Sequence, residues 1–288
     1  MPPDLVLVGH LAQDLQPDGT FRLGGTVTYA ALLAARLGLR PGIVTSAPER
    51  DLAQLAALIP DLQLAAVPAP TPTIFENSYL AGQRQQFLRA RASILTAAAI
   101  PLAWRAAPLT LLGPIADEIA PDVAVCLTGT YRAATPQGWL RAWGSDGRVT
   151  PIPWRTAADT LPHLTAIILS VEDLAIAAGE ADGAATMAGW AAQVPIVVLT
   201  DGPRGATLWQ HGARTHIPAF PVTEVDPTGA GDCFATAFLI ALQRTGDAPT
   251  AVCYAHAAAS FAVQAPGTTG IPTPEQIAAR LAEMPDAG

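Results

Sequence analysis

The sequence predicts an α/β fold, a largely parallel sheet with helices on both faces. Short apolar runs alternate with helical stretches along most of the chain. The candidate strands lie at residues 5–8, 43–45, 62–67, 110–112, 123–127, 166–169 and 196–199. Such alternation is typical of parallel strands joined by helical crossovers. At 288 residues and 50% hydrophobic content, the chain can bury a large core. We therefore expect one domain over residues 1–288.

The helical stretches have recognisable boundaries. Gly24-Gly25 precedes a helical run over residues 26–37, which Gly38 ends as a C-terminal glycine commonly does. Further helices are expected at residues 50–59, 183–193, 233–242 and 273–284. The run at 233–242 is apolar on all sides, which indicates a buried helix.

Two segments depart from this alternation. Pro17-Asp18-Gly19 marks a tight turn within residues 13–23. Residues 71–96 alternate apolar and polar side chains around Ala81-Gly82, which is typical of a hairpin with one solvated face. We expect the two segments to form a small β-hairpin lid. The alternative is a solvated edge whose charges discourage aggregation.

Charge limits the classes of partner. A net charge of −8 and a pI near 5.0 disfavour nucleic acid and anionic membranes as partners. All 16 basic residues are arginine. Because lysine is absent from the sequence, Schiff-base chemistry and a Walker-type lysine are both excluded. A phosphate must therefore be held by backbone N–H groups, arginine or a metal.

The cysteines and the N-terminus favour a cytoplasmic location. Cys126, Cys233 and Cys253 are odd in number and lack the spacing of metal ligands, so a disulfide framework is not expected. The apolar run at residues 5–8 is too short for a signal peptide, and no basic residue precedes it. No uninterrupted apolar stretch reaches the roughly 18 residues of a membrane span.

The strongest candidate site lies within residues 220–243. Gly229-Ala230-Gly231 forms a glycine turn that opens the apolar helix, and such a turn directs unpaired N–H groups and the helix dipole at an anion. Asp232 follows at once. A carboxylate there would repel an anion unless its task is to accept a proton from a hydroxyl. It could equally be an ordinary helix N-cap, and local physics leaves the two readings balanced.

The stretch D-P-T-G-A-G-D-C-F, Asp226 to Phe234, resembles the C-terminal signature of the ribokinase-like (PfkB) family of carbohydrate and nucleoside kinases. The resemblance implies a three-layer α/β/α sandwich with a mostly parallel sheet and a hairpin lid. It implies ATP and Mg²⁺ as cofactors, with Asp232 as general base. The N–H groups of Gly229, Ala230 and Gly231 would stabilise charge on the transferred group.

The resemblance also implies a pocket for the hydroxyl acceptor. Asp14, Gly24 and Gly25 match the aspartate and glycine pair that bind acceptor hydroxyls in ribokinase-like enzymes. The family's sugar kinases usually have an asparagine after the glycines, whereas this chain continues to Tyr29. The pattern G-G-T-V-T-Y, with L-G-P-I-A at residues 112–116, is similar to the branch containing myo-inositol kinases. In a nucleoside kinase, Tyr29 or Phe75 could stack on a base.

The nucleotide would lie along two further turns. Residues 200–205, T-D-G-P-R-G, are similar to the family's Thr-x-Gly-x-x-Gly turn, which implies that Thr200, Gly202 and Gly205 contact ATP. Gly267 lies in a loop resembling the one near the adenine. Without the resemblance, the first segment is only a plausible β-turn.

Metal sites are implied at two places. Ser170-x-x-Asp173 stands where the family usually has Asn-x-x-Glu, which implies that Asp173 or Glu172 supports Mg²⁺ through water. The alternative is an acidic pair that stabilises a helix N-terminus. Asp226 and Thr228 match positions that often coordinate a monovalent cation, so K⁺ is a possible cofactor.

Taken together, these patterns predict a cytoplasmic ATP-dependent kinase that phosphorylates a hydroxyl of a small polyol or sugar. The partners expected are the acceptor and ATP, without nucleic acid or membrane, in a monomer or a homodimer formed through the lid. A nucleoside kinase of the same family is the first alternative. A ligand-binding member that has lost the chemistry is the second.

Overall fold

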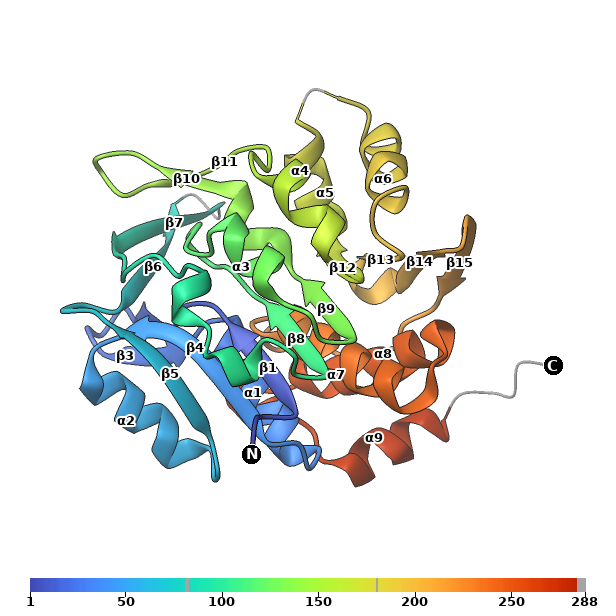
Figure 1. Ribbon diagram of the computed structural model, residues 1–288, viewed down its shortest axis with the longest axis horizontal. Coiled ribbons are helices and arrows are strands. Elements are labelled where there is room, and N and C mark those ends of the chain that lie inside the picture. The colour runs from blue at the N-terminus through green and yellow to red at the C-terminus, as the bar shows by residue number, and fades with distance from the viewer. Residues whose placement is uncertain (81–82, 180, 284–288) are drawn as a thin grey trace.

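The chain folds around a nine-stranded sheet (Figure 1). In this computed structural model, residues 1–80, 83–179 and 181–283 are described. The strand order is β15-β14-β13-β12-β9-β8-β1-β4-β5. The strands are β1 (Leu5–Val8), β4 (Pro41–Ala47), β5 (Gln63–Pro68), β8 (Leu109–Leu112), β9 (Tyr131–Ala134), β12 (Ala166–Ser170), β13 (Ile196–Thr200), β14 (Ala206–Gln210) and β15 (Ala213–Ile217). Pairing is parallel from β13 to β5, and only the β13-β14-β15 edge is antiparallel.

Helices cover both faces of this sheet (Figure 1). One face carries α1 (Thr26–Arg36), α2 (Glu49–Leu58), α7 (Ala230–Thr245), α8 (Ala248–Ala262) and α9 (Pro274–Leu281). The other carries α3 (Pro121–Cys126), α4 (Ala157–Thr160), α5 (Val171–Ala178) and α6 (Gly183–Ala191). Short 3₁₀ turns are η1 (Ala97–Ala99), η2 (Leu102–Trp104), η3 (Pro136–Leu140), η4 (Leu161–His163), η5 (Gly202–Arg204) and η6 (Gly267–Gly270). Each face buries its own apolar cluster, which confirms the predicted three-layer α/β/α sandwich.

The predicted lid is a separate four-stranded sheet in the order β3-β2-β6-β7. Its strands are β2 (Ala12–Leu15), β3 (Phe21–Gly24), β6 (Thr73–Leu80) and β7 (Gln83–Ala90). Parallel pairing of β2 with β6 joins the two predicted segments into one sheet. Phe75 and Leu88 pack with Ile115 and Ala116, so an apolar cluster fixes the lid to the loop after β8. The turn predicted at Ala81-Gly82 lies outside the described residues.

A two-stranded ribbon, which the sequence did not predict, lies beside the lid. It consists of β10 (Arg141–Trp143) and β11 (Val149–Pro151). The Leu88 N–H of β7 donates to the Gly147 carbonyl at 2.8 Å, and Phe87 forms a single bridge with Arg148. The ribbon therefore pairs with the outer edge of β7, which would otherwise present unpaired backbone groups.

One predicted strand is wrong. Residues 123–126 belong to α3 and residue 127 follows its end, so the segment is no strand, and the strand in this part of the sheet is β9. Pro121 occupies the first turn of α3, where proline is well tolerated. Val123 and Ala124 are buried while Val125 is 55% exposed, which is the pattern of a helix lying on a surface. A short apolar run does not by itself distinguish a strand from a buried helical turn.

The antiparallel edge β14–β15 was also missed, because its outer strand is largely exposed and lacks an apolar run. The other predicted strands are confirmed within one or two residues. The predicted end of the last helix, Met284, lies outside the described residues. No helix in the described part of the chain is long and apolar enough to cross a membrane.

Candidate active site

The predicted anion turn stands at the start of α7. Gly229 is the N-cap residue and has a left-handed backbone with φ of 79°. The Ala230 N–H donates to the Pro227 carbonyl at 3.2 Å and so helps to close the turn. The N–H groups of Gly231 and Asp232 follow at helix positions that have no intrahelical acceptor. An anion at this end of α7 would therefore meet the Gly231 and Asp232 amides, while the Ala230 amide is already engaged.

Asp226 ties this turn to the loop at η6. Its Oδ1 accepts the Thr228 N–H at 3.0 Å, and its Oδ2 accepts the Gly267 N–H at 2.9 Å. Burial raises the Asp226 pKa, but the hydrogen bonds from Thr228 and Gly267 and the charge of Arg22 together hold it below its usual value. The ionised Asp226 carboxylate therefore links the turn at the start of α7 to the η6 loop, through its hydrogen bonds from the backbone N–H groups of Thr228 and Gly267.

Asp232 lies in the first turn of α7, and its side chain is partly buried. Burial raises the pKa of its carboxyl to about 6. A hydrogen bond from the Thr26 hydroxyl and the charge of Arg141 oppose this rise, whereas the charge of Asp173 adds to it. A carboxyl with a pKa near 6 is ionised at neutral pH and can still take up a proton, as a general base must.

Glycines let the start of α1 approach Asp232. Gly25 is the N-cap of α1 with φ of 88°, and a Cβ there would lie 2.7 Å from the His10 carbonyl oxygen. Gly113 follows β8, and a Cβ there would lie 2.3 Å from Cγ2 of Thr26. Neither position has room for a side chain. Thr26 is consequently fixed between the sheet and Asp232, with 6% of its surface exposed.

The predicted acceptor residues also come together. Asp14 on β2 lies against Gly24 on β3, where a Cβ would stand 2.4 Å from the Asp14 Oδ2. Gly24 leads directly into Gly25 and α1, so the lid strand that faces this carboxylate is continuous with the start of α1. Glycine at residue 24 leaves the space that the Asp14 carboxylate fills.

Tyr29 is buried in the protein and is not available to stack on a ligand. It is 2% exposed, and its ring packs beneath Gly229, where a Cβ would lie 2.2 Å from Cδ1. Burial, with the charges of Asp232, Asp14 and Asp226, raises the pKa of its hydroxyl. The ring therefore supports the anion turn from below.

Asp173 caps the start of α5 together with Ser170, and its charge also acts on Asp232. Ser170 and Asp173 form a capping box at the start of α5: the Asp173 N–H donates to the Ser170 hydroxyl at 3.0 Å, and the Asp173 Oδ2 accepts the Ser170 N–H at 3.2 Å. Burial raises the pKa of Asp173. Glu172 is exposed beside it.

A resident metal cage is not formed by these acids. No group of three or more His, Cys, Asp or Glu side chains that could hold a metal ion occurs among the described residues. The partly buried carboxylate of Asp173 does fit the alternative arrangement, in which Mg²⁺ keeps its waters and is held mainly by substrate phosphates.

A cavity of about 280 Å³ adjoins the anion turn. Thr200 and Gly202 line one side of it, and Ala230 and Gly231 line the end at the start of α7. Much of the remaining lining is apolar, including Phe220, Phe234 and Val263. We call this space the donor cavity. An apolar cleft that opens onto an anion-binding helix start suits a ligand with a flat base and a phosphate tail.

Two predicted nucleotide residues are outside the described lining of the donor cavity. Gly205 has φ of 97°, and a Cβ there would lie 2.3 Å from the Ile217 carbonyl oxygen, so its role in the structure is to let β14 and β15 approach. Gly267 stands at the η6 loop, bound to Asp226.

His256 on α8 lines the donor cavity, and the sequence analysis did not identify it. It is 6% exposed, and burial lowers its pKa to about 4, so the imidazole is neutral. The Phe234 ring meets it edge-on at 5.0 Å. Its Nε2 has no hydrogen-bond partner in the described part of the chain. An isolated histidine in an alanine-rich helix carries no spacing signal that could have revealed this position.

Arg141 was missed as well. It is the first residue of β10, and its charge acts on both Asp232 and Asp173. The sequence offered one usable signal, namely that arginine is the only basic residue type in a chain without lysine.

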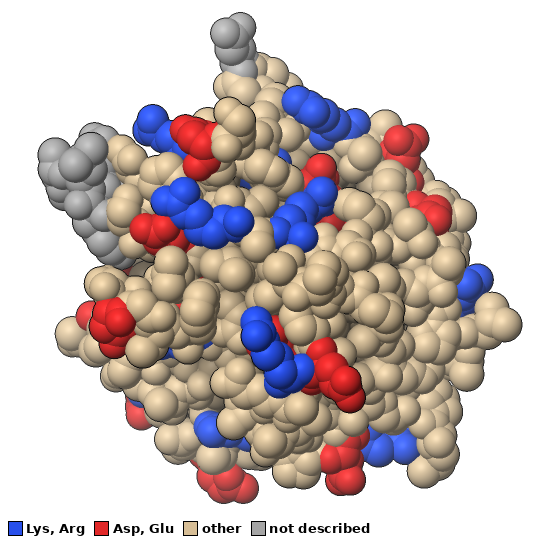
Figure 2. Space-filling view, turned by 90° about the vertical axis from the view of Figure 1, so that its left-hand side faces the viewer, with Lys and Arg blue, Asp and Glu red and all other residues tan. Residues whose placement is uncertain are grey.

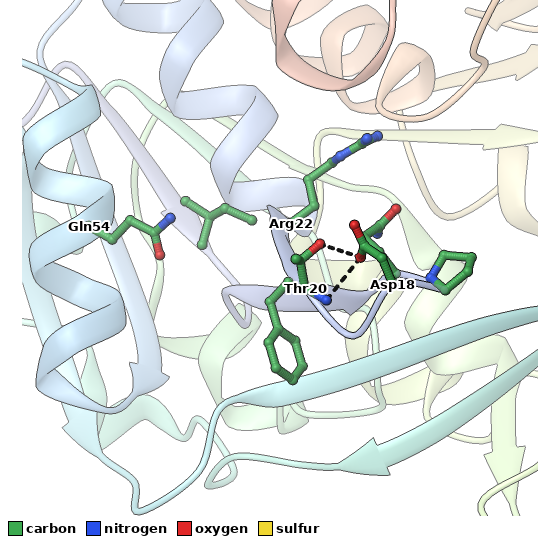
Figure 3. Close-up of a pocket in the computed structure, with 8 residues that line it drawn as sticks. Asp18, Thr20, Arg22 and Gln54 are labelled. Atoms are coloured by element: carbon green, nitrogen blue, oxygen red, sulfur yellow. Dashed lines mark hydrogen bonds between the residues drawn. The ribbon is translucent and has the colours of Figure 1, made fainter.

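A wider hollow of about 530 Å³ lies elsewhere, between the β2–β3 hairpin and α2 (Figure 3). Gln54 of α2 faces the hairpin across it, and Asp18 accepts hydrogen bonds from the Thr20 N–H and hydroxyl at 3.0 and 2.6 Å. Those bonds brace the hairpin turn. None of the residues predicted for the site lines this hollow in the described part of the chain, so the smaller donor cavity is the better candidate.

The molecular surface agrees with the mixed charge of the sequence. On the lid side, arginines are interspersed with acidic residues and form no broad basic patch in that view (Figure 2).

Residues 146–276 match the family model described as pfkB family carbohydrate kinase. An 80-residue stretch is 42% identical to the bifunctional protein HldE of Bradyrhizobium diazoefficiens, covering 27% of this chain and 16% of the relative. An 80-residue stretch is 39% identical to ribokinase of Bacillus subtilis, covering 27% of each. A 135-residue stretch is 28% identical to inositol 3-kinase of Zea mays, covering 44% of this chain and 32% of the relative. The chain thus spans less than a third of the length of each of these relatives.

Solved structures match over almost the whole chain. A pyrophosphate-dependent myo-inositol-1 kinase converted into a myo-inositol-3 kinase has a TM-score of 0.79 at 19% identity, over 96% of this chain and 98% of that one. The ribokinase of Arabidopsis thaliana complexed with ribose and ATP has a TM-score of 0.76 at 21% identity, over 98% of this chain and 99% of that one. At such identities, the likeness shows the fold.

The sandwich, its lid and the helix α7 that begins at a glycine turn define a ribokinase-like fold. The family match covers Asp173, Asp232 and the residues lining the donor cavity. The match to the pfkB family carbohydrate kinase model thus lies in the second half of the chain, while the likeness in fold to the Arabidopsis ribokinase extends over 98% of it.

Proposed function

We propose that this protein is a kinase that transfers the γ-phosphoryl group of ATP to a hydroxyl of a small polyol or sugar. The observation that carries the proposal is the position of Asp232, which is partly buried in the first turn of α7, beside the anion turn, and accepts a hydrogen bond from the Thr26 hydroxyl. Residues 1–288 act in this proposal as one domain, with the lid over the acceptor.

In the proposed mechanism, Asp232 takes the proton of the acceptor hydroxyl as its oxygen forms a bond to the γ-phosphorus. The bond from that phosphorus to the β,γ-bridging oxygen breaks, and ADP leaves. The Gly231 and Asp232 amides hold the equatorial oxygens of the transferred group. Since Asp232 must be ionised, the rate should fall as pH decreases through about 6.

The two proposed metal cofactors, Mg²⁺ and K⁺, would be held by different residues. Mg²⁺ would be held by the donor phosphates and, through water, by Asp173 with Glu172 nearby, and when bound it would neutralise phosphate charge. A K⁺ site at Asp226 and Thr228 is part of the proposal, although the Asp226 carboxylate already accepts two backbone N–H groups. Full activity in buffer free of both potassium and sodium would refute that assignment.

The donor cavity supports ATP as the donor. A pyrophosphate donor, as used by one structural neighbour, has no base to place in an apolar cleft. The neutral His256 is a hydrogen-bond acceptor that an exocyclic amine could satisfy. Thr200 and Gly202 line the same cleft, so an adenine nucleotide fits it better than a bare polyphosphate does.

The acceptor proposed is a polyol or sugar, myo-inositol being one member of the class. Asp14 supplies a carboxylate that can accept bonds from neighbouring hydroxyls. A nucleoside acceptor is less well supported, because the ring of Tyr29 is packed under Gly229 and is not available for stacking. The non-catalytic alternative is disfavoured by the raised pKa of Asp232.

The assay that tests the function is a panel of polyols, sugars and nucleosides, each with Mg·ATP and with Mg·pyrophosphate. We expect ADP formation that depends on one polyol or sugar. If no acceptor yields ADP or phosphate above the background of Asp232→Asn, the kinase proposal fails. Faster turnover with pyrophosphate than with ATP would contradict the proposal that ATP is the phosphoryl donor.

The proposed setting is the cytoplasm, in keeping with three free cysteines. A homodimer through the lid would have to use the β3 edge, where Phe21 is 53% exposed, because the ribbon already pairs with β7. Light scattering of the purified protein distinguishes that dimer from a monomer.

A further inference from the structure

We propose that His256 selects a donor nucleotide whose base carries an exocyclic amine, as adenine does. This role rests on the proposed kinase function with ATP as the donor, and it assigns recognition of the base to one atom, Nε2. Its basis is the position of the imidazole and the kind of polar groups that line the donor cavity.

One side of α8 forms a wall of the donor cavity. His256, Ala259, Ser260 and Val263 line the cavity, and their spacing of three, four and seven residues places them on the same side of the helix. His256 is 6% exposed, so its imidazole is buried in this wall while it borders the cavity. Ser260 and His256 supply the polar side-chain atoms of the wall.

Neighbouring elements hold the imidazole in place. The Phe234 ring of α7 meets it edge-on, with 5.0 Å between the two ring centroids. A hydrogen bond to the backbone of Ile217, the last residue of β15, engages one ring N–H. The buried Nε2 has no hydrogen-bond partner in the described part of the chain. Since a neutral imidazole has one donor and one acceptor nitrogen, Nε2 is the free acceptor.

The other polar side chains of the donor cavity also offer acceptors. The Ser260 hydroxyl donates to the Ala257 carbonyl at 2.7 Å, and the Thr200 hydroxyl donates to the Leu169 carbonyl at 3.3 Å, so both protons are engaged. Glu224 adds a carboxylate, which accepts hydrogen bonds. Among the described side chains that line the cavity, none therefore has a free proton to donate to a base.

This arrangement of acceptors suits adenine. Adenine presents an amine with N–H donors, whereas hypoxanthine has a carbonyl oxygen in the same place. That oxygen would meet the lone pair of Nε2, and the buried nitrogen would stay unpaired. The apolar side chains of Phe220, Val222 and Phe234 line the same space, which strengthens a hydrogen bond made there and the penalty for a missing one.

A purely structural role would use the same contacts. His256 could serve only to pack α8 against α7 and β15. Substitution would then change the affinity for all nucleotides equally, whereas recognition of the amine changes the affinity for adenine nucleotides relative to inosine nucleotides. The ratio of these two affinities therefore distinguishes the two roles.

The experiment compares the wild type with His256→Leu, which has no hydrogen-bonding side-chain atom, and His256→Gln, whose amide oxygen can accept a bond. His163→Leu in η4 removes a histidine outside the described lining of the cavity and is the matched control. Calorimetry with Mg²⁺ on the full chain gives the affinities for ADP, for its inosine counterpart IDP, for pyrophosphate and for AMP-PNP, a non-hydrolysable analogue of ATP. Steady-state kinetics give kcat/KM with ATP and with inosine triphosphate. Melting temperatures show whether each variant is folded.

We expect the wild type to bind ADP about tenfold or more tightly than IDP, with the same preference for ATP over inosine triphosphate in kcat/KM. In His256→Leu the ADP and IDP affinities should lie within about threefold of each other, chiefly because ADP binds more weakly. The affinity for pyrophosphate, which has no base, should not change. His256→Gln should keep part of the preference for ADP, and His163→Leu should match the wild type.

Equal affinities of the wild type for ADP and IDP would overturn the proposal, and so would an unchanged ratio in folded His256→Leu. If His256→Leu does not fold, the wild type decides with purine riboside diphosphate, which has a hydrogen atom in place of the amine. An affinity equal to that for ADP would then count against the role. A wild type that turns over no acceptor but prefers ADP to IDP refutes the kinase function and leaves the recognition of the base in place.

Discussion

The ring of Tyr29 fills the space that a side chain on Gly229 would need. A Cβ at residue 229 would lie 2.2 Å from Cδ1 of Tyr29, and the backbone there has φ of 79°. The Tyr29 ring thus packs directly against the backbone of the anion turn. Both this contact and the positive φ require glycine at residue 229.

Gly229→Ala should therefore lose most of its activity, by about 100-fold, and should melt at a lower temperature. The matched control is Gly246→Ala, which has φ of 69° but meets no atom within 4 Å, so it carries only the backbone strain. Kinetics and thermal melts of the two variants separate the effect of the steric clash with Tyr29, present only at residue 229, from the effect of the positive φ, present at both residues. Equal effects in both would contradict the packing of Tyr29 against the turn.

Gly231→Ala tests whether a ligand occupies the space over the helix start. A Cβ at residue 231 meets nothing within 4 Å, so the protein itself tolerates alanine there. We expect normal stability, a kcat at least tenfold lower and a higher KM for ATP, because the methyl group would enter the phosphoryl position. Gly189→Ala in α6 is equally free of contacts and serves as the control. Full activity of Gly231→Ala would count against an anion at this turn.

Glu118 is a structural residue that holds the loop after β8. It is fully buried and accepts hydrogen bonds from the N–H groups of His10, Ile115 and Ala116 at 2.7 to 3.0 Å. Glu118→Ala leaves three buried donors without this acceptor, so we expect a loss of about 3 kcal/mol or more in the free energy of unfolding. Denaturant titration measures it.

Glu283→Gln provides the reference for that loss, since this side chain is 64% exposed. Its unfolding free energy should lie within about 0.5 kcal/mol of the wild type. A similarly small effect of Glu118→Ala would show that the loop is held by other contacts.

Asp232 should also make stability depend on pH. Its pKa is about 6 in the folded chain against 3.8 for an unperturbed carboxyl, so the folded state favours the protonated form. Stability from this group is complete below about pH 3.8 and is lost as pH rises through 6. Asp232→Asn cannot ionise and should melt a few degrees above the wild type at pH 8. The difference should vanish near pH 4, and a constant difference between these pH values would argue against the raised pKa.

The sequence predicts the parts of the site that depend on local backbone geometry. The run from Asp226 to Asp232 encodes a turn, a left-handed glycine and a helix start within a few residues, and each of those preferences acts locally. The two lid segments were predictable for the same reason, because alternation and turn residues mark hairpins.

Side chains that reach the site from distant elements could not be predicted in this way. Arg141 arrives on a ribbon whose position is fixed by pairing with β7, and His256 lines the donor cavity because α8 packs against α7. Tyr29 has the aromatic character of a stacking residue, yet tertiary packing places it under Gly229. The strand expected at residues 123–127 failed because an apolar run of that length fits a short helix equally well.

The most direct test of Asp232 as general base is the kcat of Asp232→Asn with the acceptor identified in the panel, beside the exposed control Asp122→Asn. The side chain of asparagine has nearly the same shape as that of aspartate, and its amide oxygen can accept the hydrogen bond from the Thr26 hydroxyl. It cannot take a proton from the acceptor. We predict that kcat falls by about 100- to 10,000-fold while binding of AMP-PNP stays within about threefold of the wild type. A kcat within a few fold of the wild type would contradict the account.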